Sequence, residues 1–137
     1  MTLFGYATMR PAGRTARPLL YLAAGFNFVA AGLVVLLARI APGVLGVTSF
    51  DAGALLFVDL SALLVVGYGI GYALAGRDLR RFWPCIALGV LGKLGVVVLV
   101  FACFVAGRTT PLVTLLACGD ALFAAAFVGL LRRHGAT

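Results

Sequence analysis

WPCIALGVLGKLGVVVLVFACFVA, residues 83–106, is long and apolar enough to cross a bilayer, yet it carries Lys93 near its middle. At a helical rise of about 1.5 Å per residue, Lys93 lies roughly 15 Å from Trp83, about half of a hydrocarbon core of roughly 30 Å. A lysine at that depth costs about 3 kcal/mol on insertion scales, so it should face protein, pair with an acid or lose its proton. The rest of the chain must therefore supply a polar environment for Lys93.

The composition is that of an integral membrane protein. Of 137 residues, 64% are hydrophobic and only 11% are charged, and the mean hydropathy is +1.16, so lipid is the solvent of this fold. Four apolar segments are each near the ~20 residues that a spanning helix needs: 18–39, 51–75, 83–106 and 111–131. We interpret the first as a span rather than a signal peptide, because its apolar run exceeds the usual h-region. We predict an all-α, four-helix transmembrane bundle, a single domain over 18–134, preceded by a cytoplasmic tail over 1–17.

The basic residues lie in alternate connecting segments, and the net charge is +7. Most of them precede the first span, separate the second from the third, or follow the fourth: Arg10, Arg14, Arg17, Arg77, Arg80, Arg81, Arg132 and Arg133. The other side holds only Arg39 and Arg108. The positive-inside rule therefore predicts an N-in/C-in topology, with a tight cytoplasmic turn over 77–81 and Trp83–Pro84 opening the third helix. The lipid bilayer is the partner that this charge indicates, and no interleaved aromatic pattern supports nucleic acid.

Four polar residues predict a layer inside the membrane. Asn27, Asp59 and Asp120 lie eight or nine residues inside their own spans, roughly 12–14 Å from a membrane face. Because the spans alternate in direction, these three residues and Lys93 are expected to converge near the midplane, with Lys93 in salt-bridge reach of Asp59 or Asp120. Two carboxylates around one ammonium leave a negative site unless one acid holds a proton. The layer is either a binding site or structural glue between helices.

Glycines and tyrosines predict how the helices pack. Gly67 and Gly71 are four residues apart and share one helix face, where another backbone can approach closely. Gly89 shares a face with Lys93 in the same way. These small-residue faces favour a homo-oligomer or a partner membrane subunit, with Gly67 and Gly71 as the leading contacts. Tyr68 and Tyr72 lie toward the cytoplasmic end of the second span, where an aromatic belt is expected.

Catalytic and metal-binding signatures are mostly absent from the sequence. Cys85, Cys103 and Cys118 form no CxxC pair, and the single histidine, His134, follows the last span. A haem or a histidine-rich metal centre therefore cannot be built in the membrane, and we expect no metal and no cofactor. We assign no catalytic residue, and chemistry would have to use Asp59, Asp120 and Lys93.

A resemblance to known proteins rests on GYGIGYALAGRDLRRFWPCIALGVLGK, residues 67–93, and GDALFAAAF, residues 119–127. These runs resemble a group of small bacterial four-span membrane proteins of uncharacterised function, which share a Gly-Tyr-rich helix end, an Arg/Asp/Arg turn, Trp-Pro and then Gly-Lys. The chain departs from that pattern at Gly119, where asparagine is expected, and at Leu79, where proline is usual. The resemblance implies the fold and a bacterial inner membrane, and it implies nothing about a substrate.

Two functions fit these observations. In the first, the polar layer binds or translocates a proton or a small polar solute, because three ionisable groups at one depth exceed what a structural bundle needs. In the second, the layer is permanently satisfied and the chain is a non-catalytic accessory or assembly subunit of a larger membrane complex. A cavity in contact with Lys93 is the structural feature that distinguishes the first from the second.

Overall fold

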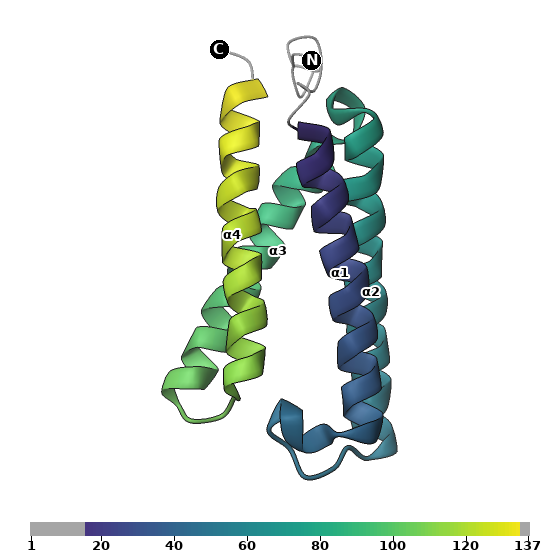
Figure 1. Cartoon of the computed structure of the whole chain (residues 1–137), viewed down its shortest axis with the longest axis vertical. Helices are drawn as coiled ribbons and strands as arrows, with labels where there is room; N and C mark the ends of the chain where they lie inside the picture. Colours follow the sequence, from purple (N-terminus) through teal and green to yellow (C-terminus); the bar gives the residue numbers. More distant parts are fainter. Residues whose placement is uncertain (1–15, 135–137) are drawn as a thin grey trace, which may run out of the picture.

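The computed structural model describes residues 16–134, and nearly all of them are helical. Within this range the elements are α1 (Ala16–Ile40), a short 3₁₀ helix η1 (Pro42–Leu45), α2 (Ala52–Arg77), α3 (Leu79–Val105) and α4 (Pro111–His134) (Figure 1). All four α-helices are long and apolar enough to cross a membrane. The predicted all-α, four-helix membrane fold is therefore confirmed. Most of the tail predicted over 1–17 lies outside the described residues.

A single residue, Asp78, separates α2 from α3. Its backbone N–H donates to the Leu74 carbonyl at the end of α2 (3.0 Å), and its carboxylate accepts from the Arg81 N–H at the start of α3 (3.2 Å). Aspartate is a favoured N-cap because it satisfies a backbone amide that has no partner within the helix. The predicted start of the third helix at Trp83–Pro84 is wrong, because this cap starts α3 four residues earlier and Pro84 is accommodated inside the helix.

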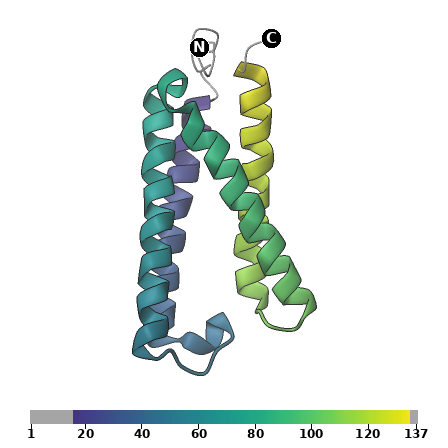
Figure 2. The same ribbon diagram turned by 180° about the vertical axis from the view of Figure 1, so that it is seen from behind.

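The four helices form two antiparallel pairs, α1 with α2 and α3 with α4. The pairs lie close together at the end that holds the start of α1 and the α2–α3 turn, and they separate toward the opposite end (Figures 1 and 2). We call these the narrow end and the wide end. At the wide end, the Thr110 hydroxyl donates to the Val44 carbonyl of η1 (2.9 Å). This hydrogen bond links the connection after α1 to the residue that precedes α4, and so links the two pairs.

The buried core lies at the narrow end. Its largest fully buried side chains are Leu20, Tyr72, Ile86 and Phe127, one from each helix. The rings of Tyr72 and Phe127 meet edge to face, with centroids 4.9 Å apart, a favourable arrangement for aromatic pairs. Toward the wide end many large apolar side chains are exposed, including Leu56, Phe57, Leu60, Leu99, Phe101 and Leu115. The intramolecular packing is therefore concentrated at the narrow end.

Three glycines of α2 and α3 differ in what surrounds them. A Cβ on Gly89 would lie 2.6 Å from Cε1 of Tyr72, and one on Gly71 would lie 3.3 Å from Cβ of Cys85, so both glycines allow α2 and α3 to approach closely. A Cβ on Gly67 would have no neighbour within 4 Å. An oligomer or a partner subunit stays a prediction, and Gly67 is the glycine of this set that is still open to another chain.

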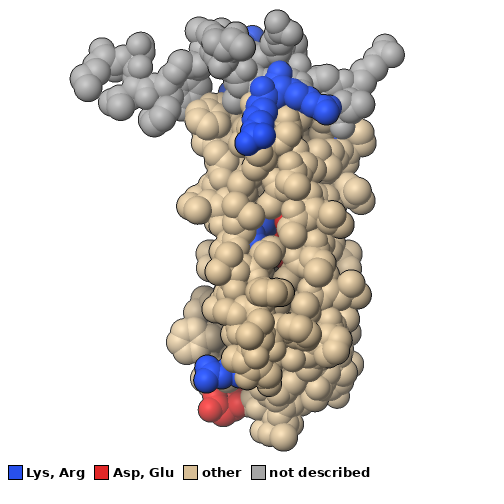
Figure 3. All heavy atoms as spheres, turned by 90° about the vertical axis from the view of Figure 1, so that its left-hand side faces the viewer, with Lys and Arg blue, Asp and Glu red and all other residues tan. Residues whose placement is uncertain are grey.

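The fold gathers most of the described arginines at the narrow end. This end holds Arg17, Arg77, Arg80, Arg81, Arg132 and Arg133, whereas Arg39 and Arg108 lie toward the wide end. On the face shown in Figure 3, charged side chains lie near the two ends, apart from one small spot about halfway along. The arrangement has the asymmetry that the positive-inside rule requires, and the N-in/C-in orientation stays a prediction.

The orientation can be checked with single cysteines placed at the two ends of a variant that lacks the natural cysteines. We expect a cysteine at Arg80, in the narrow end, to react with a membrane-impermeant maleimide only after the cells are permeabilised. We expect a cysteine at Gly43, in η1, to react in intact cells. The measurement is the labelled fraction in each state, and labelling of the Arg80 position in intact cells would show that the orientation is inverted.

The Gly89 contact predicts a local packing penalty. In Gly89→Ala, the new methyl group would meet the ring of Tyr72, which is only 1% exposed and has no room to move. Overpacking of this kind costs about 1–3 kcal/mol, measured as the free energy of unfolding in mixed micelles. Gly95→Ala is the matched control on the same helix, because no atom lies within 4 Å of the added Cβ. Equal stability of the two variants would contradict the close contact.

Candidate functional site

Lys93 lies near the middle of α3 and is buried. It is 14 residues past Leu79, the first residue of the helix, which is about 21 Å along the helix axis. Only 5% of the residue is exposed. Its ammonium is therefore held inside the bundle rather than extended to either end of α3.

Two side chains from other helices accept hydrogen bonds from the Lys93 ammonium. Nζ donates to Oδ1 of Asn27 on α1 (3.2 Å) and forms a hydrogen-bonded ion pair with Oδ1 of Asp120 on α4. The prediction that Lys93 lies in salt-bridge reach of Asp59 or Asp120 is confirmed for Asp120. Both partners come from the layer predicted from the sequence.

The amide of Asn27 links this centre to α2. Its Nδ2 donates to the Val65 carbonyl (3.3 Å), while its Oδ1 accepts from Lys93. The amide nitrogen donates one bond and the amide oxygen accepts the other, so the two bonds together fix the orientation of the amide. Contributions from α1, α2, α3 and α4 therefore meet at one polar node.

Three aromatic rings surround the same ammonium. The Lys93 Nζ lies 5.4 Å from the ring centroids of Phe26 and Phe123 and 5.7 Å from that of Tyr72, all within cation–π range. The aromatic belt predicted for Tyr72 is wrong, because this side chain is 1% exposed and faces the bundle interior. Phe123 could have been identified from the sequence, since it lies three residues after Asp120 and therefore on the same helix face.

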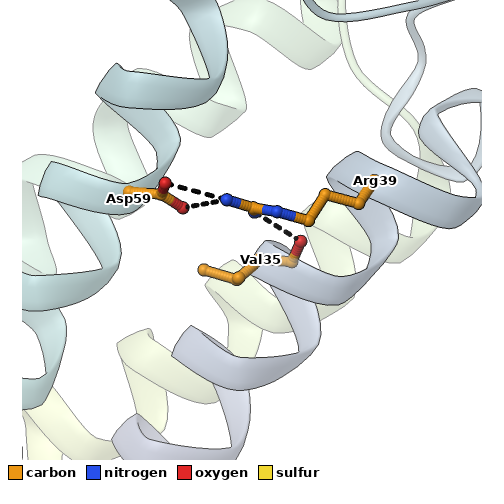
Figure 4. A network of polar contacts seen from close by, with 3 residues as sticks. All are labelled: Val35, Arg39 and Asp59. Carbon is orange, nitrogen blue, oxygen red and sulfur yellow. Dashed lines mark hydrogen bonds and ion pairs between the residues drawn. The ribbon is translucent and has the colours of Figure 1, made fainter. Parts of the chain in front are cut away.

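Asp59 does not join the Lys93 centre. Both of its carboxylate oxygens accept from Nη2 of Arg39 (2.8 Å each), and Nη1 of Arg39 donates to the Val35 carbonyl (3.0 Å) (Figure 4). The side chains of Arg39 and Asp59 are 41% and 45% exposed, respectively. The expectation that Asp59 lies in the central layer is wrong.

Helix geometry explains where Asp59 lies. It precedes Val65 by six residues, which is about 9 Å along α2 toward the wide end. It also precedes Tyr68 by nine residues, and at about 100° per residue this places it on the opposite side of the helix. Tyr68 faces α3, where its hydroxyl lies near Gly92, so Asp59 faces away from Lys93. The depth of Asp59 along α2 therefore does not determine its position, because rotation about the helix axis sets which neighbour it faces.

The absence of Asp59 changes the charge of the centre. One ammonium and one carboxylate remain, Lys93 and Asp120, with the neutral amide of Asn27 beside them. Within residues 16–134 no buried side-chain nitrogen or oxygen lacks a hydrogen-bond partner. The centre therefore carries no net charge, and the expected shared proton between two acids is not needed.

A cavity of about 210 Å³ adjoins this centre. Its lining residues come from all four helices: Asn27, Val65, Tyr68, Tyr72, Gly89, Gly92, Lys93, Val96 and Asp120. It is large enough to hold water or a small ligand. Figure 3 shows a spot of positive and negative side chains framed by uncharged residues about halfway along the molecule, the level at which Lys93 and Asp120 lie.

The cavity suits a small polar organic group or water. Its polar lining consists of an amide, an ammonium, a carboxylate and two phenol hydroxyls, which together donate and accept hydrogen bonds. Among residues 16–134, no three His, Cys, Asp or Glu side chains lie close enough together to hold a metal ion.

The Lys93–Asp120 pair predicts a strong stability coupling. Lys93→Met or Asp120→Asn alone leaves one buried charge without its counterion, which costs about 3–5 kcal/mol. The double variant removes both charges, so we expect it to be more stable than the less stable single variant. The measurement is the free energy of unfolding in mixed micelles.

The Arg39–Asp59 pair is the control for this experiment. It also joins a cation to a carboxylate, but its side chains are 41% and 45% exposed, so Arg39→Gln and Asp59→Asn should each lower the free energy of unfolding by less than the variants of the buried pair. Equal losses at the two pairs would contradict the assignment of Lys93–Asp120 as a buried centre.

Comparison with known proteins adds no further assignment. The chain matches no protein-family model, no curated protein and no solved structure. The resemblance to small bacterial four-span membrane proteins therefore stays a prediction.

Proposed function

We propose that this chain is a small multi-pass membrane protein that binds a proton or a small polar solute at the Asn27–Lys93–Asp120 centre and carries it across the membrane. The observation that supports the proposal is the cavity of about 210 Å³ in contact with a buried ion pair. Ionisable groups near mid-depth are typical of proton and solute pathways in membrane proteins.

The chemical cost of the centre also supports a functional role. Removing an ammonium and a carboxylate from water carries a desolvation penalty of several kcal/mol for each ion. A bundle that needed only a polar contact between α3 and α4 would be satisfied by serine or asparagine at less cost. The use of Lys93 and Asp120 therefore favours a site at which a proton or a charged group is exchanged.

The geometry suggests how a proton and a solute are coupled. When Asp120 takes up a proton, it no longer balances the charge of Lys93. The ammonium keeps its bond to Asn27 and its contacts with the rings of Phe26, Tyr72 and Phe123. It then offers a positive charge to a solute in the cavity, and release of the solute allows the Lys93–Asp120 pair to re-form as the proton leaves.

The proposal includes a location. We place the chain in the inner membrane of a bacterium, with the arginine-rich narrow end in the cytoplasm. The distribution of arginines supports the orientation, and the resemblance of residues 67–93 and 119–127 to bacterial four-span proteins supports the compartment.

An accessory or assembly subunit is the second candidate. The observation that favours it is the complete pairing of buried polar side chains within residues 16–134, since a structural centre needs no vacant partner. In that case the cavity holds only water, and the exposed apolar surface at the wide end packs against another subunit. Transport activity and a stable larger complex are therefore the two properties that separate the candidates.

Proton and solute flux in proteoliposomes tests the proposal. We expect Asp120→Asn to abolish flux, because an amide cannot take up and release a proton, and Lys93→Met to abolish solute binding. Asp59→Asn is the matched control, since it removes an aspartate of a spanning helix that lies outside the centre.

Each variant must first be shown to fold, by a single symmetric peak in size-exclusion chromatography and a cooperative thermal transition. Loss of flux in Asp120→Asn with retention in Asp59→Asn supports transport at the centre. Absence of flux in the wild-type protein, together with its co-purification in a fixed larger complex, would favour the accessory subunit instead.

A further inference from the structure

A second hollow lies between α2 and α3. It has a volume of about 340 Å³, and its lining is apolar apart from one tyrosine: Leu63, Leu64, Gly67, Tyr68, Gly71, Cys85 and Leu88. Leu63, Leu64 and Leu88 are more than half exposed, so this groove opens on the surface that faces lipid in a membrane. We call it the α2–α3 groove.

The shape of the groove follows from the packing of the two helices. α2 and α3 are in contact where Gly71 meets Cys85, and they diverge toward the wide end (Figure 2). Gly67 lies one turn further along α2, where a Cβ would have no neighbour within 4 Å. The groove is therefore a wedge with its closed tip at Gly71 and free space beside Gly67.

Tyr68 is the one residue that lines both the α2–α3 groove and the cavity beside Lys93. A Cβ on Gly92 would lie 3.2 Å from the Tyr68 hydroxyl, so the phenol extends across to α3 at a position without a side chain. The residue is only partly buried. Tyr68 therefore lies at the boundary between an apolar groove that is open to lipid and a polar cavity that holds a charge pair.

We propose that the cavity is entered sideways from the bilayer through the α2–α3 groove, and that its ligand is an amphiphile with a small carboxylic-acid head and one apolar chain, such as a long-chain fatty acid. The head lies beside Lys93 and Asp120, and the chain lies in the groove. This inference rests on the proposed function of the polar centre and names the class of solute that it takes.

Charge balance selects the carboxylic acid. The centre is neutral, so a bare carboxylate would give it a net negative charge in a low-dielectric environment, which is costly. A carboxylic acid that enters with its proton avoids this cost: the proton passes to Asp120, and the resulting carboxylate pairs with the Lys93 ammonium. The total charge stays zero before and after binding.

The groove selects the apolar chain. A water-soluble solute would gain nothing from a wall of leucine side chains, whereas an acyl chain is already dissolved in the lipid that the groove adjoins. Entry requires the side chain of Tyr68 to swing aside, and the open space beside Gly67 lies on the groove side of the same helix turn. A side-chain rotation of this kind needs no rearrangement of the helices.

The experiment uses the full chain in lipid nanodiscs and palmitic acid that carries a diazirine at mid-chain. After illumination, intact mass spectrometry measures the labelled fraction, and peptide mapping locates the label. We expect labelling at residues 63–71 or 85–88, competed by unlabelled palmitic acid. Lys93→Met and Gly67→Leu should each lower labelling about tenfold, the first by removing the head's counterion and the second by filling the groove.

Gly25→Leu is the matched control. Gly25 is an exposed glycine of another spanning helix, and its Cβ would also have no neighbour within 4 Å, so the added side chain enters lipid instead of the groove. Labelling of this variant should equal that of the wild type. If Gly67→Leu does not fold, Leu64→Trp fills the same groove from its exposed rim and takes its place.

The outcomes separate this inference from the proposed function. Labelling that persists in Gly67→Leu or in Lys93→Met overturns lateral entry of an acidic amphiphile. If flux or binding of the short acid butyrate depends on Lys93 and Asp120 while palmitic acid does not label the groove, the proposed function stands and the inference fails. Cross-links between two copies of the chain at position 67, without labelling by palmitic acid, would assign the groove to a homo-oligomer. That result would also overturn the inference.

Discussion

A lysine in the middle of a membrane must be neutralised within the protein, and the arrangement of all four helices around Lys93 satisfies this constraint. Asn27 supplies an acceptor from α1, Asp120 supplies the counterion from α4, and Tyr72 supplies a ring from α2. A lysine left in lipid would cost about 3 kcal/mol or more, which is a large share of the stability of a small protein. The relative positions of the helices are therefore coupled to one side chain.

The two ion pairs of the bundle show how environment sets the weight of an interaction. Arg39–Asp59 has both carboxylate oxygens at 2.8 Å from one nitrogen, and each of its side chains is more than two-fifths exposed. Lys93–Asp120 has less than a fifth of either side chain exposed, so each charge depends on its protein partners for stabilisation. The buried pair constrains the fold, whereas the exposed pair only fastens α1 to α2 near their ends.

The features that were predicted correctly depend on position along the chain. The features that were missed depend on the direction in which a side chain points around its helix axis. Hydropathy along the chain is sufficient for four spans, and depth is sufficient to bring Lys93 to the level of Asp120. Depth alone also placed Asp59 in the centre and Tyr72 in an aromatic belt. Both assignments failed because a residue at the right level still has to face the right neighbour. The cavity could not be predicted at all, because it depends on the divergence of the two helix pairs.

That divergence links the charge pair to the rest of the membrane. If the two helix pairs stayed in contact along their whole length, they would enclose Lys93 in a dry core. The ion pair between Lys93 and Asp120 would then be permanent. Here the tight packing stops at the narrow end, at residues such as Ile86 and Phe127, and the polar centre lies just beyond it, where the helices begin to separate. Tyr68 fills part of the space that opens between α2 and α3. The proposed lateral route to the ion pair therefore passes Tyr68, and it requires the rotation of one phenol ring rather than the opening of the bundle.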